Sequence, residues 1–280
     1  MLILVAIDGS THSARALDLL PRLPWAQPPR LRLLHVIEKA VLAQPGITPS
    51  PVAQPKRETK RADAAAERLT RTALAKMRRL DPQAARRIER GPVSDKLLTA
   101  AEQEGADLLV MGSRGLSNVQ AFLMGSVSQQ VVTYAHCSTL VVKGRPRAVK
   151  RLLLAADGSP SSEQALSFLM TQFKPAGLQV AVVTVRDYPT VSTPTVSTPP
   201  SQQIEEQYAA RLARAGFSAK AHAATGHAAA RIIDTARRQR ADLIVVGSRG
   251  LTGLQRFLLG SVSRQVVKYC PSSVLVVRGR

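Results

Sequence analysis

The feature that most constrains this chain is its internal repetition. Leu4–Ser10 (LVAIDGS) returns as Leu153–Ser159 (LLAADGS), and Gly112–Ser128 (GSRGLSNVQAFLMGSVS) returns as Gly247–Ser263 (GSRGLTGLQRFLLGSVS). Self-similarity of this kind is the signature of a duplicated structural unit. A chain of 280 residues is long enough for two units that each bury a core. We therefore predict two domains, residues 1–146 and 147–280, with GRPRAVK (144–150) as the short linker between them.

Within each copy, short apolar runs alternate with segments of helical periodicity. In the first copy we expect strands at 2–7, 31–37, 86–90, 107–111 and 139–142, and helices at 13–23, 58–80, 94–104 and 127–135. Continuous apolar runs are typical of strands covered on both faces, and apolar positions three to four residues apart are typical of packed helices. The β-α-β-α order predicts an α/β fold with two tandem, doubly wound, parallel five-stranded sheets.

Two proline-rich segments interrupt this order at the same connection of each copy. They span residues 40–55 and 188–200, and the second contains the direct repeat TVSTP-TVSTP. Because proline disfavours helices and central strands, we expect exposed loops here, with a lid over a ligand as the alternative.

The chain is strongly basic, with a formal net charge of +20. Residues 1–148 carry 22 basic and 12 acidic side chains and residues 149–280 carry 17 and 7, so each half contributes +10. The excess forms no tail, and aromatic residues for base stacking are scarce. We therefore expect a generally basic surface or an acidic partner, and consider a nucleic-acid partner the weaker interpretation.

Composition and spacing also argue against several classes of protein. No apolar run approaches the roughly 18 to 20 residues needed to span a bilayer, and the apolar start of the chain lacks the length and basic flank of a signal peptide. Cys137 and Cys270 are not equivalent between the copies, so no disulfide framework is indicated. The histidines show no ligand-like spacing, so we expect no metal site beyond an ion such as Mg²⁺ that a nucleotide brings. A cytoplasmic protein fits these features.

Candidate binding residues follow two strands in each copy. Asp8-Gly9-Ser10 and Asp157-Gly158-Ser159 follow the first strand, and a longer motif follows the fourth. That motif is Gly112-x-x-Gly115, nine residues, then Gly125-Ser126-Val127-Ser128, and it recurs with unchanged spacing at Gly247, Gly250, Gly260, Ser261, Val262 and Ser263. In an open parallel sheet both motifs should meet at the carboxyl ends of the strands, where such folds bind ligands.

The residue types in the longer motif suit phosphate. Glycines let the backbone approach an anion closely, and the first amides of the following helix, with its dipole, favour negative charge. The alternative is that these residues serve only as turns and as a helix cap. Unchanged spacing in two otherwise divergent copies favours a triphosphate cradle. Asp8 and Asp157 are either turn formers or acceptors for ribose or adenine groups, with the second favoured, and the roles of Arg114 and Arg249 stay open.

These motifs closely resemble the universal stress protein family, in its ATP-binding branch with the pattern G-2x-G-9x-G-(S/T), over nearly all of both halves. The resemblance implies that Asp8 and Asp157 contact the nucleoside and that Val36 and Val185 face the adenine. It implies that ribose and phosphates are held by Gly112, Gly115, Gly125, Ser126, Val127 and Ser128, and by Gly247, Gly250, Gly260, Ser261, Val262 and Ser263. It also implies that the last strands of the domains pair as an intramolecular pseudo-dimer, which can associate again as a homodimer.

The sequence favours binding over catalysis. A phosphoryl-transfer enzyme needs a metal-binding acid, a residue that positions the nucleophile, and usually a Lys or Arg on the phosphates. No Walker GxxxxGK motif is present, and no second acid recurs near Asp8 in both copies. We expect an ATP-binding sensor or regulator of a stress response, with at most slow hydrolysis and no assigned catalytic residue. The alternatives are an ATPase of the adenine nucleotide alpha hydrolase type and a basic scaffold for an acidic partner or nucleic acid.

Overall fold

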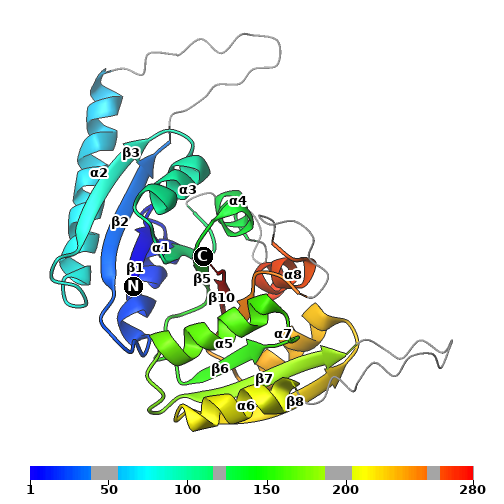
Figure 1. Ribbon diagram of the computed structural model, residues 1–280. Helices are drawn as coiled ribbons and strands as arrows, with labels where there is room; N and C mark the ends of the chain where they lie inside the picture. Colours follow the sequence, from blue (N-terminus) through cyan, green and yellow to red (C-terminus); the bar gives the residue numbers. More distant parts are fainter. Residues whose placement is uncertain (39–55, 116–123, 187–203, 251–258, 280) are drawn as a thin grey trace, which may run out of the picture.

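The computed structural model describes residues 1–38, 56–115, 124–186, 204–250 and 259–279 (Figure 1). The first copy comprises β1 (Leu2–Ala6), α1 (Thr11–Leu19), a 3₁₀ turn (Leu20–Arg22), β2 (Arg30–Ile37), α2 (Lys56–Met77), β3 (Ala85–Arg90), α3 (Val93–Gln103), β4 (Leu108–Gly112), α4 (Ser126–Tyr134) and β5 (Ser138–Val142). The second comprises β6 (Arg151–Ala155), α5 (Pro160–Gln172), β7 (Gln179–Arg186), α6 (Ile204–Arg214), β8 (Ser218–Thr225), α7 (Ala228–Arg238), β9 (Leu243–Gly247), α8 (Ser261–Tyr269) and β10 (Ser273–Val277). The proline-rich segments predicted as loops lie outside the described residues.

The predicted elements of the first copy are confirmed, with boundaries shifted by a few residues. The largest shift is at α1, which we expected over 13–23 and which spans Thr11–Leu19. It begins earlier because Ser10 caps its N-terminus, and it gives way to a 3₁₀ turn that contains Pro21. None of the helices in the described ranges is long and apolar enough to cross a membrane.

The ten strands form one sheet in the order β3-β2-β1-β4-β5-β10-β9-β6-β7-β8. Within each copy the strands are parallel, as predicted. The two five-stranded halves are not separate sheets, because β5 and β10 pair antiparallel with Leu140 opposite Leu275. The pairing of the last strands that the family resemblance implied is therefore confirmed, and it makes the tandem chain an intramolecular pseudo-dimer.

Helices cover both faces of this sheet, and each face buries its own core. On one face α1, α2, α5 and α6 pack against inward side chains such as Val5 and Val245. On the other face α3, α4, α7 and α8 pack against side chains such as Leu109 and Ile244. Both cores run through the two copies without a break, so the burial of apolar surface stabilises the copies jointly.

Two cations reach across the junction of the copies and cap helices of the opposite copy. Lys143, just after β5, donates from Nζ to the carbonyl oxygen of Cys270 (2.7 Å) at the end of α8. Arg278, just after β10, donates to the carbonyls of Val132 (2.8 Å) and Thr133 (3.1 Å) at the end of α4. Such contacts satisfy last-turn carbonyls and complement the negative end of the helix dipole. Burial lowers the pKa of Lys143 to about 8.

Candidate functional site

The predicted binding motifs meet where the chain path reverses in each copy. β1 and β4 are neighbours, and the connections that leave them run in opposite directions, toward β2 and toward β5. The loops after these strands touch, because Ser10 Oγ donates to the carbonyl oxygen of Arg114 (3.3 Å). The same contact joins Ser159 to Arg249 at 3.3 Å in the second copy. The structure therefore brings both motifs of each copy to the switch point of the sheet, where doubly wound folds bind ligands.

Two helices begin at each switch point, and their N-termini are treated differently. α1 is capped by Ser10, whose Oγ accepts from the amide of Ser13 at 3.1 Å, and α5 is capped in the same way by Ser159. α4 and α8 begin after Gly125 and Gly260, and neither has a side-chain cap in the described structure. The first amides of α4 and α8 are therefore left for an outside acceptor, at the positive end of each helix dipole.

Two of the predicted serines are used internally by the protein. Ser128 Oγ donates to the carbonyl of Gly112 (2.9 Å), and Ser263 Oγ donates to that of Gly247 (2.7 Å), with both side chains buried. The hydroxyls of this pair therefore tie each helix to its strand, whereas the family resemblance assigned Ser128 and Ser263 to the ribose and phosphates. Their backbone amides remain in the uncapped first turn.

The neighbouring residues of the motif lie further out. Ser126 and Ser261 are exposed at the first position of α4 and α8, so their hydroxyls stay at the surface. Val127 is partly buried against the core, while Val262 is 36% exposed. The two copies thus present the same backbone but a slightly different apolar surface beside it.

The first glycine of each motif is required by packing. A Cβ on Gly112 would lie 2.6 Å from the backbone carbon of His12, and one on Gly247 would lie 2.7 Å from that of Ser161. Real side chains do not approach backbone so closely, so these glycines let α1 and α5 sit against β4 and β9. The sequence interpretation assigned both glycines to the ligand, whereas the structure gives them a reason that needs none.

The second glycine of each motif faces the predicted aspartate. A Cβ on Gly115 would lie 2.9 Å from Asp8 Oδ2, and one on Gly250 would lie 2.7 Å from Asp157 Oδ2. Only glycine leaves this carboxylate oxygen accessible from the loop. The other oxygen of Asp8 accepts from the amide of Ser10 at 2.9 Å, and Asp157 repeats the contact with Ser159 at 3.0 Å. Each aspartate is a turn former through one oxygen and presents the other to the site.

The third glycine of each motif fits closely under the loop. A Cβ on Gly125 would lie 3.4 Å from Arg114 Cα, and one on Gly260 would lie 3.2 Å from Arg249 Cα. Their amides donate to the carbonyls of Ser113 (2.9 Å) and Ser248 (2.8 Å) and so close the loop around the helix start. Residues 116–123 and 251–258, inside the nine-residue spacing, lie outside the described residues.

The predicted adenine contacts are placed in the wall of the site. Val36 lies near the carboxyl end of β2, is 8% exposed, and packs into the core beside Leu34. Val185 has the equivalent place on β7 and is partly buried against the same core. Val36 is thus mainly a core residue, and little of its side chain is left for a ligand.

Positive charge gathers at the first site. Burial and the nearby Arg15 and Arg114 lower the pKa of His12, and only Asp8 opposes them. His12 is therefore neutral at pH 7, beside two cations that favour an anion. Sequence reasoning treated His12 as an ordinary surface or core imidazole, because its equivalent in the second copy is Ser161 and duplication gave no signal.

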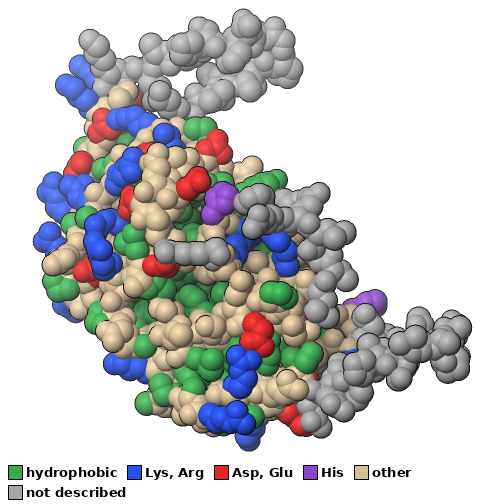
Figure 2. Space-filling model, viewed as in Figure 1, with side chains coloured by type: hydrophobic (Ala, Val, Ile, Leu, Met, Phe, Trp, Pro, Cys, Tyr) green, Lys and Arg blue, Asp and Glu red, His purple; other side chains and the backbone are tan. Residues whose placement is uncertain are grey.

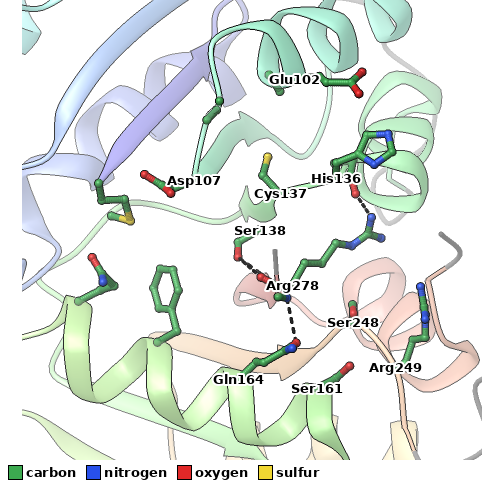
Figure 3. A pocket seen from close by; sticks show the side chains of 18 of the residues that line it. Glu102, Asp107, His136, Cys137, Ser138, Ser161, Gln164, Ser248, Arg249 and Arg278 are labelled. Atoms are coloured by element: carbon green, nitrogen blue, oxygen red, sulfur yellow. Dashed lines mark hydrogen bonds between the residues drawn. The ribbon is translucent and has the colours of Figure 1, made fainter. Parts of the chain in front are cut away.

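A groove of about 1030 Å³ runs between the two copies, and at one end it reaches Ser248 and Arg249 of the second copy's motif. Figure 3 shows Asp107, Cys137 and Ser138 of the first copy facing Gln164 and Ser161 on α5, with Arg249 at one end. Some of its polar groups are already bonded: Arg278 contacts α4 of the first copy, and within the second copy Gln164 Oε1 accepts from the amide of Gly279 at 2.9 Å. The groove is thus largely a by-product of the junction, and it does not coincide with the switch point of the first copy.

The linker between the copies (residues 144–150) is packed against both of them. Val149 of the linker is buried in the core, and Arg22 donates to the carbonyl of Pro146 at 3.1 Å. Lys150 donates its amide to Asp242, the residue equivalent to Asp107 in the open groove.

Both free cysteines are buried. Burial raises the pKa of the Cys137 thiol to about 11 and also raises that of Cys270. Neither thiol is therefore ionised at pH 7, which agrees with a packing role.

Comparison with known proteins identifies the family of this chain. The chain matches the Universal stress protein family twice, over residues 1–143 and 148–278. A universal stress protein of Mycolicibacterium smegmatis is 30% identical over 295 aligned residues, which cover 99% of this chain and 97% of that protein. One of Bacillus subtilis is 32% identical over 146 residues, 50% of this chain and 97% of that relative.

A solved structure agrees with the fold. The crystal structure of a universal stress protein from Archaeoglobus fulgidus superposes with a TM-score of 0.73, covering 99% of this chain and 96% of that one at 21% sequence identity. Two family matches, a relative aligned along its whole length, and the shared fold lead to one conclusion: the chain belongs to the universal stress protein family, as a tandem pair of its domains.

Proposed function

We propose that each copy binds one ATP molecule at its switch point, and that the protein acts in the cytoplasm as a nucleotide-dependent regulator of a stress response. The observation that carries the proposal is the contrast between neighbouring helices. α1 and α5 are capped by serines, whereas α4 and α8 begin at glycines without a side-chain cap. Helices α3 and α7 also begin without a side-chain cap, so what distinguishes α4 and α8 is that their uncapped starts lie at the switch points of the sheet. Backbone amides and the positive end of a helix dipole at such a place favour an anion.

The residues present fit a nucleotide. The first-turn amides after Gly125 would hold phosphates, while the exposed hydroxyl of Ser126 would add a further bond. The Asp8 oxygen that faces Gly115 would accept from a nucleoside hydroxyl. Arg15 and Arg114, the two cations that lower the pKa of His12, add positive potential next to this place. Gly260, Ser261, Asp157 and Gly250 provide the same set in the second copy.

The position of α4 and α8 suggests how bound nucleotide could be sensed. The N-terminus of α4 lies at the proposed phosphate site, and its C-terminus is capped by Arg278 of the other copy. α8 has the same relation to Lys143. A ligand that orders one end of these helices would stabilise the arrangement of the two copies, provided that it binds that arrangement more tightly than others.

Calorimetric titration of the full chain with ATP tests the proposal. We expect two sites per chain and a higher unfolding temperature with ATP, because a ligand that binds only the folded state stabilises it. Turnover measured on the same sample should stay well below about 1 per second, the lower range of ordinary enzymes. Absence of ATP binding would refute the binding proposal, and faster turnover would replace the regulator with an enzyme.

A further inference from the structure

The outer face of α2 carries a row of arginines that the nucleotide site does not use. Arg57, Arg61, Arg68, Arg71 and Arg78 follow one another at steps of four, seven, three and seven residues, and all five are exposed. Arg78 directly follows the last residue of α2, and its amide continues the helical pattern by donating to the carbonyl of Leu74 at 3.0 Å. Residues at these spacings share one face of a helix. With 1.5 Å per residue, the row is about 31 Å long. Figure 2 shows Lys and Arg side chains gathered over this part of the molecule, where α2 lies in Figure 1.

The acidic side chains of α2 are directed elsewhere. Asp63 pairs with Arg90, and Glu67 pairs with Arg86 at 2.8 Å, so both turn toward the neighbouring strand β3. Glu58 is exposed as well, and the side chains of Asp63 and Glu67 keep 45% and 47% of their surface accessible. Pairing with cations of β3 thus offsets two of the carboxylates of this helix, and arginines outnumber acids on its outer face.

We propose that the arginine row of α2 binds the phosphate backbone of a nucleic-acid duplex without reading its sequence. A duplex presents one negative charge per roughly 1.7 Å of its axis, a denser and longer row than most acidic protein segments offer. Arginine matches phosphate through paired N–H donors. The residues between the arginines on this face, Ala64 and Ala75, are small and exposed, so they let a large polyanion approach.

The same face fits other polyanions less well. It has no bulky apolar side chain among its exposed residues to enter a bilayer, and no aromatic side chain on which single-stranded bases could stack. Among its described residues, the second copy has no equivalent row on α6, the helix that corresponds to α2. Its helix α6 has 11 residues, with Glu205 and Glu206 in its first turn balancing Arg211 and Arg214 in its last. The proposed surface therefore belongs to the first copy alone.

Fluorescence anisotropy of a labelled 20-base-pair DNA duplex of arbitrary sequence, titrated with the full chain without nucleotide at several salt concentrations, tests this proposal. Five phosphate contacts predict a slope of about −4.5 for log K against log[salt]. The double variant Arg68→Gln with Arg71→Gln should reduce the slope by about 1.8 and weaken binding about 50-fold at 0.1 M salt. The control Arg214→Gln with Arg237→Gln removes the same charge from exposed positions of α6 and α7 and should change the slope by less than about 0.5.

Three outcomes would overturn the proposal: no binding of duplex by the parent chain, equal losses in the α2 variant and the control, or tight binding of a poly-glutamate peptide with none of duplex. Circular dichroism of both variants shows whether the fold is kept. Because ATP is absent throughout, failure here leaves the nucleotide proposal standing, and failure of ATP binding leaves this one standing.

Discussion

The two copies agree closely at their switch points and differ on their outer faces. Contacts at Asp8 and Asp157, and the Cβ distances at Gly115 and Gly250, agree to within a few tenths of an ångström. By contrast α2 has 22 residues and a basic outer face, whereas α6 has 11 residues and balanced charge. The loops at the strand ends tolerate few sequence changes, because backbone atoms of neighbouring elements are in close contact there. The outer face of a helix can change more freely, because only its inner face is packed.

The largest effect is expected from adding a side chain to the glycines that lie closest to the backbone of a neighbouring helix. Gly112→Ala and Gly247→Ala should each lower the free energy of unfolding by about 3 kcal/mol, because the new methyl group would overlap backbone. Gly125→Ala, whose Cβ has 3.4 Å of room, is the matched control and should change it by less than about 1 kcal/mol. Urea denaturation measures both. Equal effects of Gly112→Ala and Gly125→Ala would mean that the strand-end packing is looser than described.

The cations at the junction should give the next largest effect. Arg278→Met and Lys143→Met each leave last-turn carbonyls of the opposite copy without a donor, so we expect a loss of about 2 kcal/mol in unfolding free energy for each. Thermal denaturation should show drops of several degrees. If either variant is as stable as the parent, the hydrogen bonds of that cation do not contribute measurably to the stability of the junction.

Lys143 also predicts a pH dependence. Its pKa in the folded chain is about 8, below the ordinary 10.5, so the unfolded chain binds the proton more tightly. The Lys143 contribution to unfolding free energy should therefore rise as the pH goes from about 8 to 10.5. Lys143→Met should remove that rise. An unchanged pH profile in this variant would contradict the assignment.

The aspartates test whether the two sites work alike. Asp8→Asn and Asp157→Asn keep the turn-forming oxygen and remove the charge, and each should weaken ATP binding in its own copy about tenfold, as expected for loss of a charge-assisted hydrogen bond. Calorimetry of each single variant should then resolve one strong and one weak site. If Asp8→Asn affects both sites equally, or neither, the sites are not the independent equivalents that the geometry suggests.

The smallest effect is expected in the pH dependence of ATP binding, which should differ between the two copies because only the first has a histidine at its site. Burial and two arginines hold the pKa of His12 below its usual value, and bound phosphate would favour the protonated ring. ATP affinity of the first copy should therefore rise about threefold as the pH falls from 7 to 5.5, with no such rise in the second copy, where Ser161 replaces His12. Titrations at the two pH values measure this. His12→Ser should abolish the rise and Ser161→His should transfer it, and a rise that survives His12→Ser would have another origin.

The sequence predicted the local order of elements well, because apolar runs and helical periodicity are local signals. It also placed Asp8 and Gly115 in one site, since the carboxyl ends of adjacent parallel strands must meet. It could not predict that Ser128 is tied to Gly112 or that Gly112 packs on His12, because such contacts depend on ångström-scale distances between elements. The capping of α4 by Arg278 was equally hidden, since nothing local marks a partner more than 140 residues away.

Backbone hydrogen exchange measured by mass spectrometry, with and without ATP, tests the central claim most directly. The account predicts that ATP slows exchange of the first amides of α4 (Ser126–Ser128) and α8 (Ser261–Ser263), because they would gain phosphate acceptors. The amides of Ser13 and Ser162, already bonded to serine caps, should change little. Slowed exchange confined to the groove between the copies, with none at the starts of α4 and α8, would contradict the account.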